Sequence, residues 1–202
     1  HLYTLDKPTT LLQNEQKQVT LLEAQGIKVD KKLIFFGTPN YYHGNYGQQV
    51  VQNQKVGVYL DVQNSEGNHL GMPLPKGVVR VYKADKSGAK QFIGEDKIDH
   101  TPRDEKIRIK MGEAFDVLAD RKQMEWKTLG SCGSESAWEI ILKNHKDSVE
   151  EVEIFEPAGG DWEIVSSSLP ATKKDAHSFT FKTKINARGE VKITYRVRVR
   201  WC

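Results

Sequence analysis

The final stretch of the chain, residues 190–201, constrains the fold more than any other feature. Apolar side chains occupy every second position from Val191 to Trp201, and the positions between them carry Lys192, Thr194, Arg196, Arg198 and Arg200. Such alternation is typical of a β-strand, in which successive side chains point to opposite faces, whereas a helix would scatter both sets around its circumference. The pattern therefore predicts a long strand with one core face and one basic face in water.

Short strand patterns separated by turn signals recur along the rest of the chain, and no long stretch has a convincing helical period. We expect strands at residues 9–12, 16–22, 31–36, 55–64, 78–82, 91–94, 106–111, 114–129, 137–143, 149–155, 161–165 and 178–185. Residues 84–88 are turn-forming and predict a hairpin between the strands at 78–82 and 91–94. Strands at this spacing favour a mainly β fold of antiparallel sheets, with a β-sandwich.

A cluster of small residues at 131–134 marks the expected domain boundary. A chain of 202 residues can bury the core of one large or two small β domains. We predict an irregular antiparallel β domain at residues 1–130 and an immunoglobulin-like β-sandwich at residues 131–202. The strand near 115–130 could belong to either sheet.

The overall charge is close to neutral. The chain has 30 Lys and Arg against 27 Asp and Glu, a net charge of +3. Nucleic-acid binders usually carry a pronounced basic excess, so we expect no nucleic-acid partner. No apolar run approaches the roughly 20 residues that span a membrane. The chain opens with a strand-like stretch at residues 1–5 and no initiator Met, so we expect it to be part of a longer protein.

Cys132 and Cys202 are the two cysteines, and they do not have the spacing of a metal site. Either they pair in an oxidising compartment or both are unpaired thiols. A disulfide closing a loop of this length could stabilise the fold by roughly 4 kcal/mol on the chain-entropy model. A nucleophilic role for Cys132 would need a base, such as His100 or His145, close in space.

Several segments together resemble a known protein family. They are residues 74–82 (LPKGVVRVY), 92–102 (FIGEDKIDHTP), 112–117 (GEAFDV), 143–146 (KNHK) and 195–201 (YRVRVRW), in this order along the chain. They are similar to domain-of-unknown-function family 4139, whose members commonly form the C-terminal part of longer, mostly bacterial proteins. The resemblance implies a β-rich fold and, because many members carry an export signal, a periplasmic or cell-envelope location. It implies no activity, cofactor or catalytic residue.

The acidic stretch at residues 95–105 is the best polar constellation. Carboxylates and an imidazole so close in sequence can bind a divalent metal or transfer protons, and the candidates are Glu95, Asp99, His100 and Glu105. The other interpretation is that these side chains solvate a loop between two strands and satisfy exposed backbone N–H groups. Their spacing matches neither His-Glu-x-x-His nor a calcium loop.

The loop at residues 37–47 is rich in Gly, Asn and Tyr. Tyr41, Tyr42 and Tyr46 would give it a large and adaptable contact area, as in binding loops, and aromatic platforms also suit carbohydrate. We therefore predict a ligand-binding loop, for a protein or carbohydrate of the cell envelope. The alternative is that some of these tyrosines fold back onto the sheet.

The basic face of residues 190–201 has two interpretations as well. It could dock an anionic surface, or its alternating charges could oppose edge-to-edge aggregation, and we favour the second.

The chain contains neither a Gly-x-Gly-x-x-Gly nor a P-loop pattern, and we predict no cofactor. We predict a non-catalytic binding or assembly module of a bacterial envelope protein. The alternative is a metal-dependent hydrolase that uses the acidic loop around His100.

Overall fold

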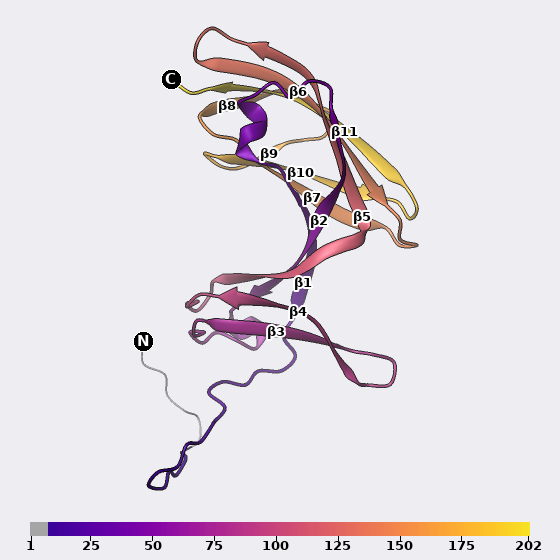
Figure 1. Cartoon of the computed structure of the whole chain (residues 1–202). Helices are drawn as coiled ribbons and strands as arrows, with labels where there is room; N and C mark the ends of the chain where they lie inside the picture. The colour runs from indigo at the N-terminus through magenta and orange to yellow at the C-terminus, as the bar shows by residue number, and fades with distance from the viewer. Residues whose placement is uncertain (1–7) are drawn as a thin grey trace.

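The computed structural model describes residues 8–202, and it is mainly β, as the sequence predicts (Figure 1). The strand-like start expected at residues 1–5 lies outside this part of the chain. The strands are β1 (Val29–Phe36), β2 (Val50–Gln63), β3 (Gly77–Ala84), β4 (Lys90–Ile98), β5 (Lys106–Thr128), β6 (Gly133–Asn144), β7 (Glu150–Pro157), β8 (Asp161–Ser167), β9 (Thr172–Asp175), β10 (Ser178–Ile185) and β11 (Glu190–Arg200). Two short 3-10 helices, η1 (Pro39–Tyr42) and η2 (Glu66–Asn68), lie in the connections.

One sheet joins most of these strands, in the order β8-β11-β6-β5-β2-β1-β7-β10-β9. Neighbouring strands are antiparallel except β1 and β7, which run parallel. Strands β3 and β4 form a separate hairpin. The antiparallel character expected from the turn-rich sequence is therefore present, with one parallel pair in the interior of the sheet.

The sheet divides between two lobes, because β1 leaves β2 part of the way along (Figure 1). Residues 29–34 of β1 pair with residues 57–62 of β2, and residues 33–36 pair with β7. The lower lobe consists of the β3–β4 hairpin, the loops at 64–76 and 99–105, and the adjoining halves of β1, β2 and β5. The upper lobe consists of β6 to β11, η1 and the remaining halves of those three long strands.

The upper lobe has its core between strands that face one another without pairing. The rings of Phe179 and Phe181 on β10 lie 5.9 Å and 5.2 Å from that of Tyr195 on β11. Strand β11 buries Ile193, Tyr195, Val197 and Val199 and exposes the polar positions between them or leaves them half-buried. The predicted two-faced strand is therefore confirmed. The immunoglobulin-like detail of this lobe stays a prediction.

The expected boundary at residue 130 does not separate two units. It falls in the turn between β5 and β6, and β5 pairs with β2 on one side and β6 on the other. Strand β1, from the first predicted domain, lies between β2 and β7. Residues 1–130 and 131–202 therefore share one sheet, because the sandwich needs the early strands β1 and β2 to connect its two sides.

The strands expected at residues 9–12 and 16–22 are also wrong. Residues 8–28 form an extended chain that projects from the lower lobe and turns at residues 12–15 (Figure 1). The turn is closed by a hydrogen bond from Glu15 N–H to Leu12 O (3.1 Å), and Leu12 is 70% exposed. The segment has strand-like side chains, but no strand of the described chain pairs with it.

A polar cluster lies inside the upper core. Arg121 on β5 and Glu156 on β7 form an ion pair with 1% and 0% exposure of their side chains. Tyr42 donates a hydrogen bond to Glu156 Oε2 (2.6 Å), and Arg121 Nη1 donates one to the Tyr195 hydroxyl (3.0 Å). The cluster connects β5, β7, β11 and η1, so it links the two sides of the sandwich.

Candidate binding site

The lower lobe contains an apolar cavity of about 460 Å³ between the β3–β4 hairpin and the lower halves of β2 and β5. The wall is largely aliphatic, with Leu60 and Val62 from β2, Ile107 and Ile109 from β5, Val79 and Val81 from β3, and Ile98 from β4. This volume falls in the range of about 300–1,000 Å³ that is usual for small-molecule sites. Several wall residues are only half-buried, because the cavity is open to solvent on one side.

Strand alternation directs these side chains into the cavity. Leu60 pairs with Ile109 and Val62 with Ile107, so one face of the β2–β5 ladder presents four aliphatic side chains together. On β3 the alternate residues Gly77, Val79 and Val81 line the same cavity from the other side. The hairpin thus covers the sheet without filling the space between them.

Polar contacts attach the hairpin to the sheet. The Lys110 N–H of β5 donates a hydrogen bond to Asp96 Oδ2 of β4 at 2.7 Å. Gly94 lies so close that an added Cβ would come within 2.7 Å of the Met111 carbonyl oxygen. The hairpin is therefore held at one edge of β5, and its apolar face is directed across β2.

Two buried asparagines shape the loop at residues 64–76, which supplies Leu70, Leu74 and Pro75 to the wall. Asn64 donates to the carbonyl oxygens of Met72 and Pro102, both at 2.8 Å. Asn68 accepts from Lys28 N–H at 2.8 Å and donates to the carbonyl of the same residue at 3.0 Å. These amides satisfy backbone groups that no strand pairs, and so they fix the loop around the cavity.

The described wall of the cavity is apolar except for one charged residue. Lys76 is the single ionisable residue among the described lining residues, and its side chain is exposed at the start of β3. All other lining side chains are aliphatic, proline or glycine. The cavity can therefore enclose an apolar group and can offer it one positive charge.

The acidic stretch does not form a single site. Glu95 accepts a hydrogen bond from Arg80 Nε (3.0 Å), whereas Asp99 Oδ1 accepts one from the backbone N–H of His100 (2.8 Å). His100 Nδ1 in turn accepts from Lys76 N–H at 3.3 Å. Glu105 is exposed, and among residues 8–202 no group of three or more His, Cys, Asp or Glu side chains is arranged to hold a metal ion. The candidate metal ligands therefore take separate, local roles.

The tyrosine loop folds back onto the sheet. Tyr42 is fully buried, so its prediction as a ligand-binding residue is wrong. Its hydroxyl instead donates a hydrogen bond to Glu156. Tyr41 is half-buried and packs on Trp138, with ring centroids 5.2 Å apart. Tyr46 keeps 43% exposure, and its hydroxyl donates to Asn40 O at 3.0 Å. Only the outer part of the loop is thus open to a ligand, and its binding role stays a prediction.

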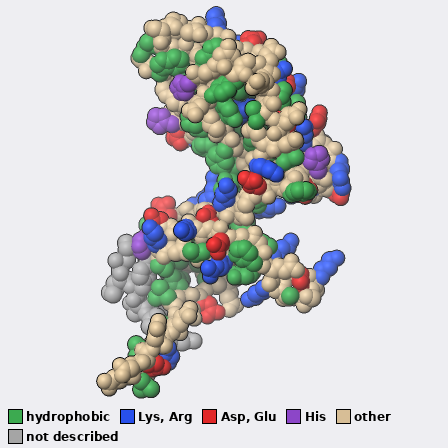
Figure 2. All heavy atoms as spheres, in the orientation of Figure 1, with side chains coloured by type: hydrophobic (Ala, Val, Ile, Leu, Met, Phe, Trp, Pro, Cys, Tyr) green, Lys and Arg blue, Asp and Glu red, His purple; other side chains and the backbone are tan. Residues whose placement is uncertain are grey.

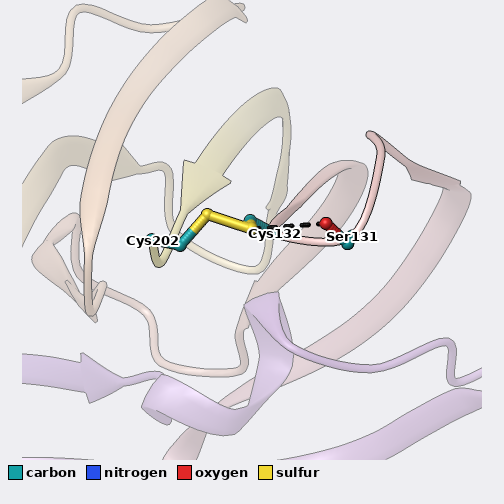
Figure 3. The surroundings of a disulfide bond; sticks show 3 residues. All are labelled: Ser131, Cys132 and Cys202. Atoms are coloured by element: carbon teal, nitrogen blue, oxygen red, sulfur yellow. Dashed lines mark hydrogen bonds between the residues drawn. A yellow bond between two sulfur atoms is a disulfide. The ribbon is translucent and has the colours of Figure 1, made fainter.

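Cys132 and Cys202 are joined by a disulfide (Figure 3). The bond links the end of the chain to the β5–β6 turn, where Trp201 N–H also donates to Cys132 O at 3.0 Å. The Ser131 hydroxyl lies 3.5 Å from the Cys132 sulfur. In this state Cys132 has no thiol, and the nucleophilic role considered from the sequence has no support.

The basic face of β11 is neutralised by glutamates on its neighbours. Arg198 pairs with Glu135 on β6 (2.8 Å) and Glu163 on β8 (2.6 Å). Arg196 pairs with Glu135 as well, and Lys192 with Glu139 at 2.6 Å. Much of this face is therefore a cross-strand charge ladder rather than an unpaired basic stripe.

Comparisons of the chain with protein-family models, curated proteins and solved structures found no match. Among residues 8–202 no helix has the length and apolar character needed to cross a membrane. Sequence patterns do not reveal the cavity, because alternation shows that a side chain faces inward but not whether the space there is filled. The only sequence features that point to the cavity are the connection at 72–77, which is rich in Pro and Gly, and the basic hairpin that follows it.

Proposed function

We propose that this chain is a non-catalytic binding module and that the lower-lobe cavity is its binding site. The observation that carries the proposal is the aliphatic, solvent-open space of about 460 Å³ under the β3–β4 hairpin. Apolar surface in contact with water is unfavourable, and burying each methylene of a ligand contributes about 0.8 kcal/mol. The burial of apolar surface would therefore be enough to bind an apolar ligand, with no chemical reaction.

We also propose that the chain acts in the cell envelope of a bacterium and that it belongs to the family that it resembles. The disulfide supports an oxidising compartment, because such bonds persist in secreted and periplasmic proteins and are rare in the cytosol. An assembly role fits the same cavity if the apolar group belongs to another protein of the envelope. The dispersed acidic residues give the alternative, a metal-dependent hydrolase, no comparable support.

The test is binding of N-phenyl-1-naphthylamine, a neutral apolar dye that becomes fluorescent in apolar surroundings. We expect saturable binding to the wild-type protein and its loss in Gly77→Leu. Gly77 shares the inward face of β3 with Val79, and an added Cβ there meets no atom of residues 8–202 within 4 Å, so leucine would occupy the cavity without a clash with them.

Gly67→Leu is the matched control. A Cβ on Gly67 also meets nothing within 4 Å, and this residue does not line the cavity. We expect Gly67→Leu to bind the dye like the wild type. No saturable binding, or equal binding by Gly77→Leu, would contradict the proposed site.

A further inference from the structure

We infer that the ligand of the lower-lobe cavity is an aliphatic chain with an anionic head group, such as a fatty-acid carboxylate, and that Lys76 meets the head. The inference rests on the proposed function and names the ligand class of the same site. It follows from the aliphatic lining and from the position of one cation at its margin.

The lining determines which part of a ligand can be buried. No aromatic ring lines the cavity among the described residues, so bases, sugars and aromatic ligands have no stacking surface. The residues that the structure describes also bring no side-chain hydroxyl, amide or carboxylate to the lining. A buried polar atom would lose its hydrogen bonds to water without replacement, which would weaken binding. The buried part is therefore a plain hydrocarbon.

The charge near the cavity determines the head group. Lys76 follows Pro75 at the rim, and its backbone is held by the hydrogen bond to His100 Nδ1 while its side chain is exposed. The hairpin at residues 76–98 contains six Lys and Arg against three Asp and Glu. Blue side chains are correspondingly prominent at its tip in Figure 2, at the end of the hairpin away from Lys76. The positive charge of Lys76 at the rim attracts an anionic head and repels a cationic one.

The two parts contribute differently to affinity. The head group stays in water, where an ion pair with an exposed lysine contributes little and is screened by salt. The hydrocarbon supplies most of the binding free energy, and affinity should rise about fourfold per added methylene until the cavity is full. Lys76 therefore selects among amphiphiles of the same chain length more than it strengthens binding.

The experiment measures displacement of the naphthylamine dye by four compounds below their micelle concentrations: octanoate, dodecanoate, dodecan-1-ol and dodecyltrimethylammonium. We expect dodecanoate to bind much more tightly than octanoate and several-fold more tightly than the other two dodecyl compounds. Lys76→Met should weaken dodecanoate about two- to fivefold and leave dodecan-1-ol unchanged. Lys83→Met, in the same hairpin but not lining the cavity, is the matched control. Circular dichroism verifies that each variant is folded.

Each other result overturns the inference in a distinguishable way. Dye binding with no preference for dodecanoate, or an equal effect of Lys83→Met, refutes the anionic ligand and leaves the binding site intact. Absence of dye binding refutes the proposed function as well. A dimer in light scattering that is lost in Gly77→Leu would identify a second copy as the occupant.

Discussion

The substitution Glu156→Gln should destabilise the protein far more than its small change in shape suggests. Glu156 is fully buried, and its carboxylate accepts hydrogen bonds from Arg121 and from Tyr42. Burial disfavours the charge on Arg121, but the attraction of the Glu156 carboxylate, together with that of Tyr195 and Tyr42, raises the pKa of the guanidinium well above its ordinary value. Without that carboxylate, a charged guanidinium would remain in the core with no counter-charge beside it.

The magnitude follows from this geometry. Removing one partner of a buried ion pair costs about 3–5 kcal/mol, because the other charge stays desolvated. The whole stability of a typical domain is about 5–15 kcal/mol. For a chain of this size, 1 kcal/mol corresponds to a change of about 2–4 °C in Tm, so Glu156→Gln should lower Tm by roughly 10 °C.

Urea unfolding followed by tryptophan fluorescence is the assay, because buried Trp138 lies 6.0 Å from the ring of Tyr42 and next to Arg121. The double variant Arg121→Met/Glu156→Leu removes both charges and should recover much of the loss, since buried ion pairs often exchange for apolar residues at little cost. A Glu156→Gln protein within about 0.5 kcal/mol of wild type would refute the reasoning, since this is the range of changes at ordinary surface positions. A double variant no more stable than Glu156→Gln would refute it as well.

Three further predictions concern other parts of the chain. The variant Cys132→Ser/Cys202→Ser should lose roughly 4 kcal/mol in urea unfolding, because the disulfide closes a long loop, and equal stability of the two proteins would contradict this. Arg108 lowers the pKa of the Asp61 carboxyl by hydrogen bonding to it, so this pair stabilises the fold above the unfolded value of about 3.9 and less as pH falls through the folded value. Stability should therefore fall more steeply in wild type than in Asp61→Asn below about pH 4, and parallel pH profiles would oppose the assignment. Gly71→Ala should cost at least about 1 kcal/mol and weaken dye binding, because φ is +93° and the new Cβ would lie 2.7 Å from a backbone nitrogen; unchanged thermal unfolding would argue against it.

Strand β5 shows where sequence patterns are sufficient and where they fail. Phe115 and Val117 have the same parity, and a regular strand would place them on the same face, yet Val117 is buried and Phe115 is 86% exposed. Lys55 pairs with Leu118 and Gly57 with Glu113, so residues 114–117 lie opposite Val56 alone. This bulge shifts the register with β2 and interrupts the alternation, so that Ala114 and Val117 are both buried while Phe115 is exposed. A period of two residues cannot reveal such a shift, because the partner strand determines it.

The candidate sites show the same division. The chemistry of the residues was evident from the sequence, but their surroundings were not. Tyr42 belongs to a loop with the composition of a binding loop, but the structure buries it beside Glu156, in the core. The carboxylates near His100 were close along the chain, and the turns of the backbone gave each one a different local contact.

The sequence by itself determined the β class, most strands and the two faces of β11, because a period of two residues is a local property of the backbone. It also contained both cysteines, but their pairing depends on where β11 ends relative to the β5–β6 turn. Only the tertiary structure decided that β1 runs between β2 and β7, that residues 1–130 and 131–202 share a sheet, and that the lower lobe is hollow. These features depend on contacts between residues far apart in the chain, whose packing no local pattern specifies.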